Sequence, residues 1–117
     1  MMATRTRTQL ATAVLRHLGL VNAEETPSAT DMIFVKERYD GTLAEMDDQN
    51  MVYWDDDAVP YIIYEPLVQL VALSVGTAYG IPSLAENIEA ARLNYMRRIR
   101  RHTQKKSDGN SVRVEQF

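Results

Sequence analysis

The residues of this 117-residue chain that could carry out chemistry do not occur at the spacings that catalysis or metal binding requires. His17 and His102 are its histidines, and neither belongs to an HExxH or HxH motif. The chain has no cysteine, so it offers no thiolate nucleophile and no sulfur ligand for zinc. The acidic run Asp55–Asp57 lacks the alternating acids and distal glutamate of a calcium loop, and is more typical of a helix cap or solvated loop. The sequence therefore predicts no catalytic residue, metal or cofactor.

The charged residues are strongly segregated along the chain. Residues 24–89 contain 14 acidic residues and only two basic ones, whereas the two ends together contain 11 basic residues and two acidic ones. An acidic middle with basic ends is typical of chains that interact through their termini. If copies of the chain assemble, the end of one copy can meet the middle of another.

Most of the basic residues near the C-terminus lie in one short stretch. It contains Arg97, Arg98, Arg100, Arg101, Lys105 and Lys106. On a helix, Arg97, Arg101 and Lys105 would share one face, which could follow a phosphate backbone. No aromatic residue is interleaved for base stacking. The stretch can therefore be a solvated end, a protein-binding anchor or a non-specific nucleic-acid contact.

Hydrophobic periodicity and capping residues predict helices in the first half of the chain. A helix is expected over residues 6–18, with its apolar stripe at Leu10, Val14, His17 and Leu18, and Gly19 just beyond its end. A second helix is expected to begin at Ser28, which has Asp31 three residues later, and to reach about Asp47. Its stripe is Met32, Val35, Tyr39, Leu43 and Met46, and a local break near Gly41 is left open.

Two further helices are expected after an acidic loop. Pro60 suits the first turn of the third helix, while Pro66 either kinks that helix or begins a new one. Residues 66–81 are apolar almost all round but shorter than the roughly 20 residues of a membrane span, so they predict a central core helix. The fourth helix is expected to begin at Ser83. Its apolar stripe comprises Leu84, Ile88, Ala91, Tyr95 and Ile99.

The end of the chain has a different character. Residues 103–111 are too polar to pack alone and predict a linker. Residues 111–117 alternate apolar and polar side chains, which favours a strand added to the edge of a partner. The predicted partner-binding residues of this arm are Lys105, Lys106, Val112, Arg113, Val114 and Phe117.

Aromatic residues gather near Pro60 and predict either a loop anchored in the core or an interface between subunits. They include Trp54, Tyr61 and Tyr64. The residues predicted to form a subunit interface or basic surface are Tyr53, Trp54, Arg97, Arg98, Arg100 and Arg101.

Several phrases of the chain resemble a known family. They are Thr8–Leu20 (TQLATAVLRHLGL), Glu24–Ser28 (EETPS), Val59–Pro60, Glu65–Ala72 (EPLVQLVA) and Tyr79–Gly80. Their order over residues 6–101 resembles the small head-to-tail connector, or adaptor, proteins of tailed bacteriophages, including the tail accessory factors of short-tailed phages.

The resemblance implies an α-helical subunit that forms a twelve-fold ring under the portal protein and extends the DNA channel. It implies a C-terminal arm that enters the portal, and a downstream tail or head-completion protein as a further partner. Genomic DNA would pass through the ring without sequence-specific contacts. The expected location is the neck of the virion, after synthesis in the host cytoplasm and without a membrane. The family offers no catalytic residues to carry over.

Together these observations predict an all-α fold, a small bundle of about four helices with a central apolar helix and an extended C-terminal arm. Residues 1–102 would form the helical connector body, and residues 103–117 the arm that docks on a partner. The predicted function is a structural head-to-tail adaptor. The alternative is a small nucleic-acid-binding accessory protein that uses the basic fourth helix.

Overall fold

The computed structural model describes the backbone of residues 4–81 and 88–114, and the side chains of residues 4–81 and 88–103. These residues form, in order, β1 (Thr4–Arg5), α1 (Arg7–His17), α2 (Ala29–Asp48), β2 (Val59–Pro60), α3 (Tyr61–Ala78) and α4 (Ile88–Val114). The all-α class and the small helical bundle are confirmed. The short antiparallel pairing of β1 with β2 was not predicted; in it Thr4 lies opposite Pro60 and Arg5 opposite Val59.

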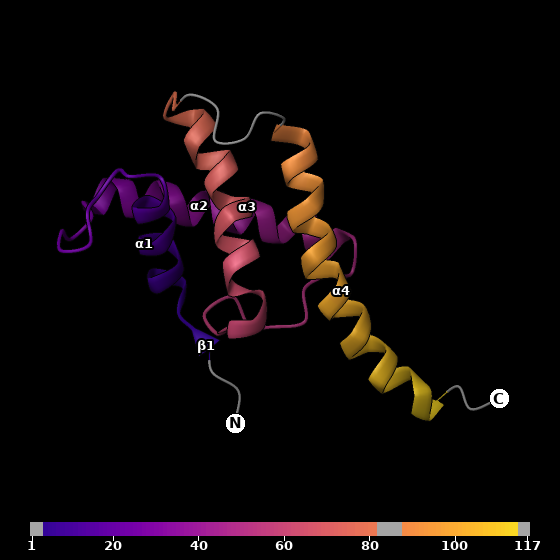
Figure 1. Cartoon of the computed structure of the whole chain (residues 1–117). Coiled ribbons are helices and arrows are strands. Elements are labelled where there is room, and N and C mark those ends of the chain that lie inside the picture. Colours follow the sequence, from indigo (N-terminus) through magenta and orange to yellow (C-terminus); the bar gives the residue numbers. More distant parts are fainter. Residues whose placement is uncertain (1–3, 82–87, 115–117) are drawn as a thin grey trace.

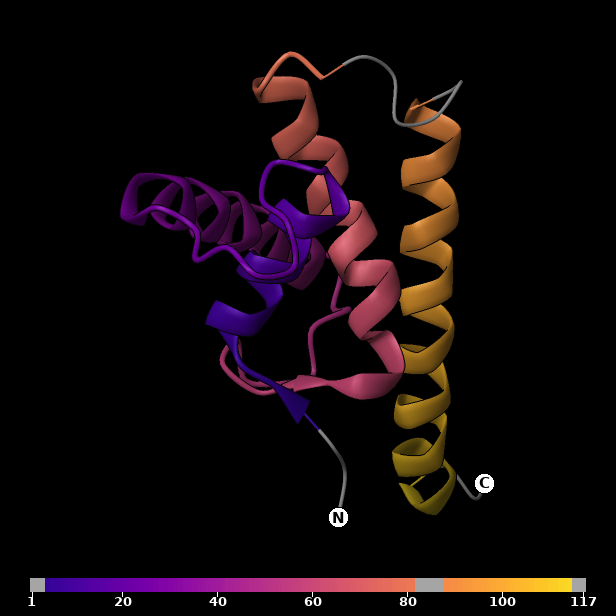
Figure 2. The ribbon, with the colours of Figure 1, turned by 60° about the vertical axis from the view of Figure 1, so that its left-hand side comes forward.

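The centre of the bundle is α3, as predicted. It lies between α4 and the pair formed by α1 and α2, and contacts all three helices (Figures 1 and 2). The helix begins directly after Pro60, which occupies its N-cap, and continues through the buried Pro66. Its length and apolar composition would also suit a membrane span, but 56% of that window is buried inside the bundle. The burial on several sides is that of a core helix.

Local capping explains where α1 and α2 begin. Thr6 and Gln9 form a reciprocal capping box at the start of α1. The Ser28 hydroxyl accepts a hydrogen bond from the Asp31 amide at 3.1 Å, as predicted for α2. Gly19 follows α1 with a φ of +74°, a conformation that glycine adopts readily. The helix α2 continues without a break through Gly41.

The buried face of α1 differs from the predicted stripe at one position. Leu10, Ala11, Val14 and Leu15 are buried, whereas His17 is exposed. The prediction that His17 belongs to the apolar stripe was therefore wrong. The reason is that the buried face of α1 also includes Ala11 and Leu15, which leaves His17 at the edge of this face, in the last residue of the helix.

The helix α4 differs from expectation in its buried face. Met96 and Ile99 are buried, while Ile88 is 43% exposed, so the predicted stripe through Ile88 is displaced toward Met96. The predicted N-cap, Ser83, lies outside the described residues. Arg92 is half-buried on the inward side, where its aliphatic stem covers the bundle.

The helix α4 also continues to Val114, so the predicted linker at residues 103–111 and the strand-like segment up to Val114 were wrong. Once a helix exists, each further residue adds a hydrogen bond at little cost. Lysine, glutamine and arginine are good helix formers, and the single Gly109 opposes the helix by only about 1 kcal/mol. The polarity of this segment therefore indicated the lack of an apolar face rather than the lack of a helix.

Replacement of Leu67 by alanine should show how strongly the bundle depends on α3. Leu67 is fully buried, so L67A should lower the free energy of unfolding by about 2–5 kcal/mol. The matched control is L93A, because Leu93 is 50% exposed and should cost less than about 1 kcal/mol. Urea denaturation measures both, and equal small losses would contradict the central position of α3.

Candidate functional site

The four predicted arginines of α4 do not act as one cluster. The Arg100 guanidinium bonds to the side-chain oxygen of Gln49 and contacts the sulfur of Met51 at 3.5 Å. Arg98 is half-buried, while Arg97 and Arg101 are exposed. Arg100 therefore holds α4 to the end of α2. Arg97 and Arg101 remain on the outward face.

The outward face of α4 combines these charges with an exposed apolar residue. Leu93, Arg97 and Arg101 follow one another at a spacing of four residues, which places them along one side of the helix. We call these three residues the basic ridge. Leu93 is half-exposed and offers apolar area beside the two guanidinium groups.

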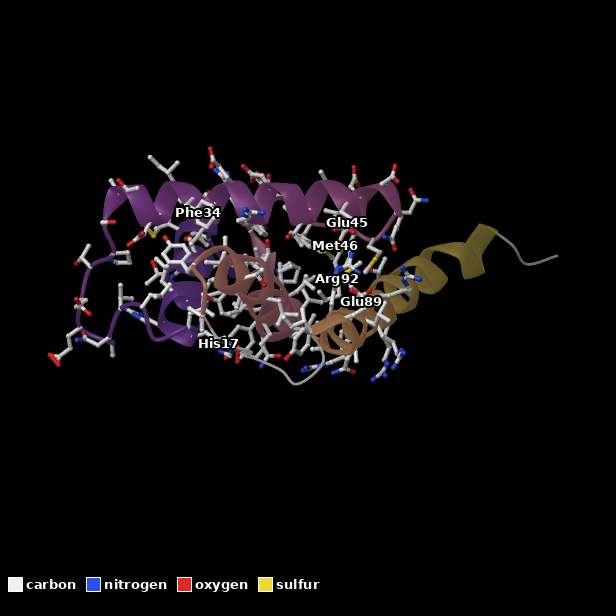
Figure 3. All side chains as sticks on the ribbon, turned by 90° about the horizontal axis from the view of Figure 1, so that it is seen from above. His17, Phe34, Glu45, Met46, Glu89 and Arg92 are labelled. Atoms are coloured by element: carbon white, nitrogen blue, oxygen red, sulfur yellow. The ribbon has the colours of Figure 1, made fainter. Side chains whose placement is uncertain are left out.

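The inward side of α4 meets α2 and α3 at a groove of about 360 Å³. Leu70, Leu73 and Met96 line its apolar part. Arg92 forms an ion pair with Glu45 of α2, and the two residues face one another in Figure 3. This ion pair therefore bridges α4 and α2 across the groove.

The chain after α2 is anchored from several directions. Asn50 has a φ of +59°, which turns the backbone back toward the core. The buried Met51 donates its amide to the Met46 carbonyl at 3.0 Å, and its carbonyl accepts a bond from the Thr103 hydroxyl at 2.8 Å. The Tyr39 hydroxyl donates to the Asp56 carbonyl at 2.9 Å. This loop is thus fixed to both α2 and α4.

Trp54 lies beside α2 and forms part of a shallow hollow of about 430 Å³. The acidic residues of the hollow are Asp40, Asp47 and Asp56, and Leu43, Val52 and Trp54 are among its apolar residues. We call this surface the acidic hollow. The Tyr53 ring meets the Trp54 ring edge-on, with centroids 5.1 Å apart, and so supports the indole from one side.

Tyr61 and Tyr64 belong to a different surface from Trp54. Their rings are stacked at 6.5 Å, and the Arg5 guanidinium lies over both, 5.0 Å from the Tyr61 centroid and 5.9 Å from the Tyr64 centroid. The Tyr64 hydroxyl donates to the Gln9 carbonyl at 3.2 Å. These contacts join the start of α3 to β1 and α1. The aromatic residues near Pro60 therefore form two groups. Tyr61 and Tyr64 join α3 to β1 and α1, and Trp54 belongs to the acidic hollow.

The arm residues are placed only in part. The backbone of Lys105, Lys106, Val112, Arg113 and Val114 is helical within α4, and Phe117 lies outside the described residues. Figure 1 shows this end of α4 extending beyond the other helices. Thr103, at the end of the part of α4 whose side chains are described, bonds to the loop after α2.

The described side chains do not form a metal centre. Within residues 4–81 and 88–103, no group of three His, Cys, Asp or Glu residues is arranged to hold a metal ion. His17 and His102 belong to α1 and α4, which are separate elements of the bundle. The acids of the hollow are spread over α2 and the loop after it.

Searches against protein-family models, curated proteins and solved structures found no match.

Tyr39 should make stability depend on alkaline pH. Burial raises the pKa of its hydroxyl from 10.0 to about 12. Between these values the unfolded chain loses this proton while the folded protein keeps it, so stability should be complete below pH 10 and fall as the pH rises to 12. Denaturation of Y39F over this range should show a shallower fall than that of the native protein.

Part of the loss of stability at alkaline pH should remain in Y39F. Burial, together with the hydrogen bond to Asp31, also raises the pKa of Tyr79 to about 12. The Tyr79 hydroxyl donates to the Asp31 carboxylate at 2.6 Å. At neutral pH, Y39F should lose about 1 kcal/mol because the Asp56 carbonyl loses its donor. An unchanged pH profile would show that Tyr39 does not resist ionisation in the folded protein.

Proposed function

We propose that this protein is a structural subunit of a tailed bacteriophage, the head-to-tail adaptor that forms a ring below the portal protein. The ring would extend the DNA channel and link head to tail. The resemblance of residues 6–101 to the connector family implies twelve copies and a portal-binding arm. The subunit would act in the neck of the virion, with a tail or head-completion protein below it.

The observation that carries this proposal is the form of α4. Its first half packs on α3 and is bonded to the loop after α2 through Arg100 and Thr103. Residues 104–114 then continue as a helix, which at 1.5 Å per residue amounts to about 16 Å. A basic helical arm attached to a small body suits insertion into a larger partner.

The polar contacts of the body also support a structural role. The Thr6 and Ser28 side chains cap helices, and the Arg7–Asp40 and Arg92–Glu45 pairs join elements that are distant in sequence. These groups are used to fix the arrangement of the helices. They hold a shape that can be repeated around a ring.

Deletion of residues 104–117 should separate the arm from the body. The truncated chain keeps Thr103 and its bond to Met51, so its melting temperature should stay nearly unchanged. Its circular dichroism should lose only the helical signal of the deleted residues. Co-sedimentation with the portal of the same phage should be lost, because many weak arm contacts in a ring supply the affinity.

A second variant, K105E/K106E, tests the charge of the arm, because it keeps the full length of the arm and reverses two of its charges. This variant should retain the melting temperature and weaken portal binding. Undiminished binding by the truncated chain would place the portal contact on the helical body instead of the arm.

Among the described side chains of α4, the exposed Arg97 and Arg101 are the charges that favour the alternative function, nucleic-acid binding. Arg100 is already bonded to Gln49, which leaves few of the described cations of α4 to follow a phosphate backbone. We therefore expect weak binding of a random DNA duplex, detectable at low salt and lost at physiological salt. Fluorescence anisotropy during a salt titration measures it.

The number of phosphates contacted follows from that titration. The logarithm of the binding constant should fall by about 0.9 per phosphate contact for each tenfold rise in salt. A slope that indicates two contacts or fewer agrees with the adaptor. Tight binding at physiological salt that is abolished in R97A/R101A would favour the nucleic-acid function.

A further inference from the structure

The basic ridge and the acidic hollow are complementary surfaces carried by the same chain. The ridge presents Leu93 with Arg97 and Arg101, and the hollow presents apolar residues among Asp40, Asp47 and Asp56. Each surface combines charge with exposed apolar area, which is the composition of an interface that excludes water at its centre. The charges of the two surfaces are opposite in sign.

The ridge and the hollow are separate surfaces of one molecule and share no lining residue. The inward side of α4 is buried through Met96 and Ile99, whereas Arg97 and Arg101 are exposed, and Arg97 borders a hollow beside Gln49 at the end of α2. Figure 3 shows α2 along one face of the molecule, while side chains on the far side of α4 point away from it. Contact between ridge and hollow therefore requires two molecules.

We infer that the basic ridge of one copy docks into the acidic hollow of a second copy of this chain. This inference rests on the proposed function and specifies the contact between neighbouring subunits. Leu93 packs against the Ala44 side of the hollow, and one guanidinium group lies over the Trp54 indole while the acids surround it. The contact is heterologous, because each copy uses a different surface toward each of its two neighbours.

A heterologous contact can repeat around a ring until it closes. It also explains why the acidic residues are concentrated in the middle of the chain and the basic ones at its ends. Like charges on equivalent surfaces disfavour the symmetrical pairings of ridge with ridge and hollow with hollow. The two surfaces thus select one direction of assembly.

The hollow has the rigidity that such a contact needs. The Tyr39 hydroxyl holds the backbone at Asp56, and Tyr53 supports the Trp54 ring. Asp40 is paired with Arg7 of α1, which fixes its carboxylate at one side of the hollow. A surface that is already formed loses less conformational entropy when it binds.

Charge reversal on each side tests the contact. R97E/R101E makes the ridge acidic, and D47R/D56R makes the hollow basic. Each double variant alone should self-associate at least about tenfold more weakly than the native chain in sedimentation velocity at low salt. An equimolar mixture should regain association, because the acidic ridge of one variant fits the basic hollow of the other, and the native surfaces that remain also fit. The control E24R/E65R reverses two exposed acids outside both surfaces and should associate like the native chain.

Cross-linking locates the contact directly, because the native chain has no cysteine. A44C copies mixed with L93C copies should give a cross-linked dimer with a short bismaleimide, in clear excess over E24C mixed with L93C. Equal yields would overturn the inference, as would a native chain that stays monomeric at every concentration.

If both charge variants associate normally and still bind the portal, the inference fails and the adaptor function stands. If ridge and hollow cross-link but portal binding is absent, the inference stands and the adaptor function fails.

Discussion

The structure depends on one constraint, the need to cover an apolar helix on nearly all its sides. Ten residues of α3 are buried along its length, and no single neighbour could cover them. An amphipathic helix of the length of α1 is marginal in water without a surface to pack on. The position of every other helix therefore follows from α3. The polar contacts between helices, such as Arg92 with Glu45, then select one arrangement among those that bury the same area.

Elements specified by neighbouring residues were predictable from the sequence, and those specified by distant contacts were not. The ends of α1 and α2 follow from caps within four residues, including Ser28 and Gly19, so their prediction was confirmed. The strand pair β1–β2 joins segments more than 50 residues apart, and neither segment is long enough to show alternation. The buried face of α4 includes Met96 on the side where Arg92 pairs with Glu45 of α2, and a periodicity of apolar residues does not detect such a contact between helices.

The candidate site divides in the same way. The composition of α4 identified its arginines, but only the folded chain separates Arg100, bonded to Gln49, from the outward Arg97 and Arg101. The acidic hollow combines α2 with a loop whose path is set by the positive φ of Asn50 and by Tyr39. In the sequence, Trp54 and Asp56 are simply neighbours in an acidic loop. One residue could have indicated the hollow. Tyr39 belongs to the apolar stripe of α2, and its hydroxyl needs a hydrogen-bond partner outside that helix.

The continuity of α4 gives the subunit a mechanical property. Met96, Ile99 and Thr103 fix one part of the helix to the body, and the same hydrogen-bonded rod continues to Val114. A helix of about 16 Å beyond Thr103 works as a lever, so a tilt of about 10° at Thr103 displaces its far end by about 3 Å. A small reorientation of the bundle is thereby converted into a shift comparable to the length of a hydrogen bond. A tilt of the body would therefore move the end of α4 at Val114, which lies farther from the body than a side chain can extend.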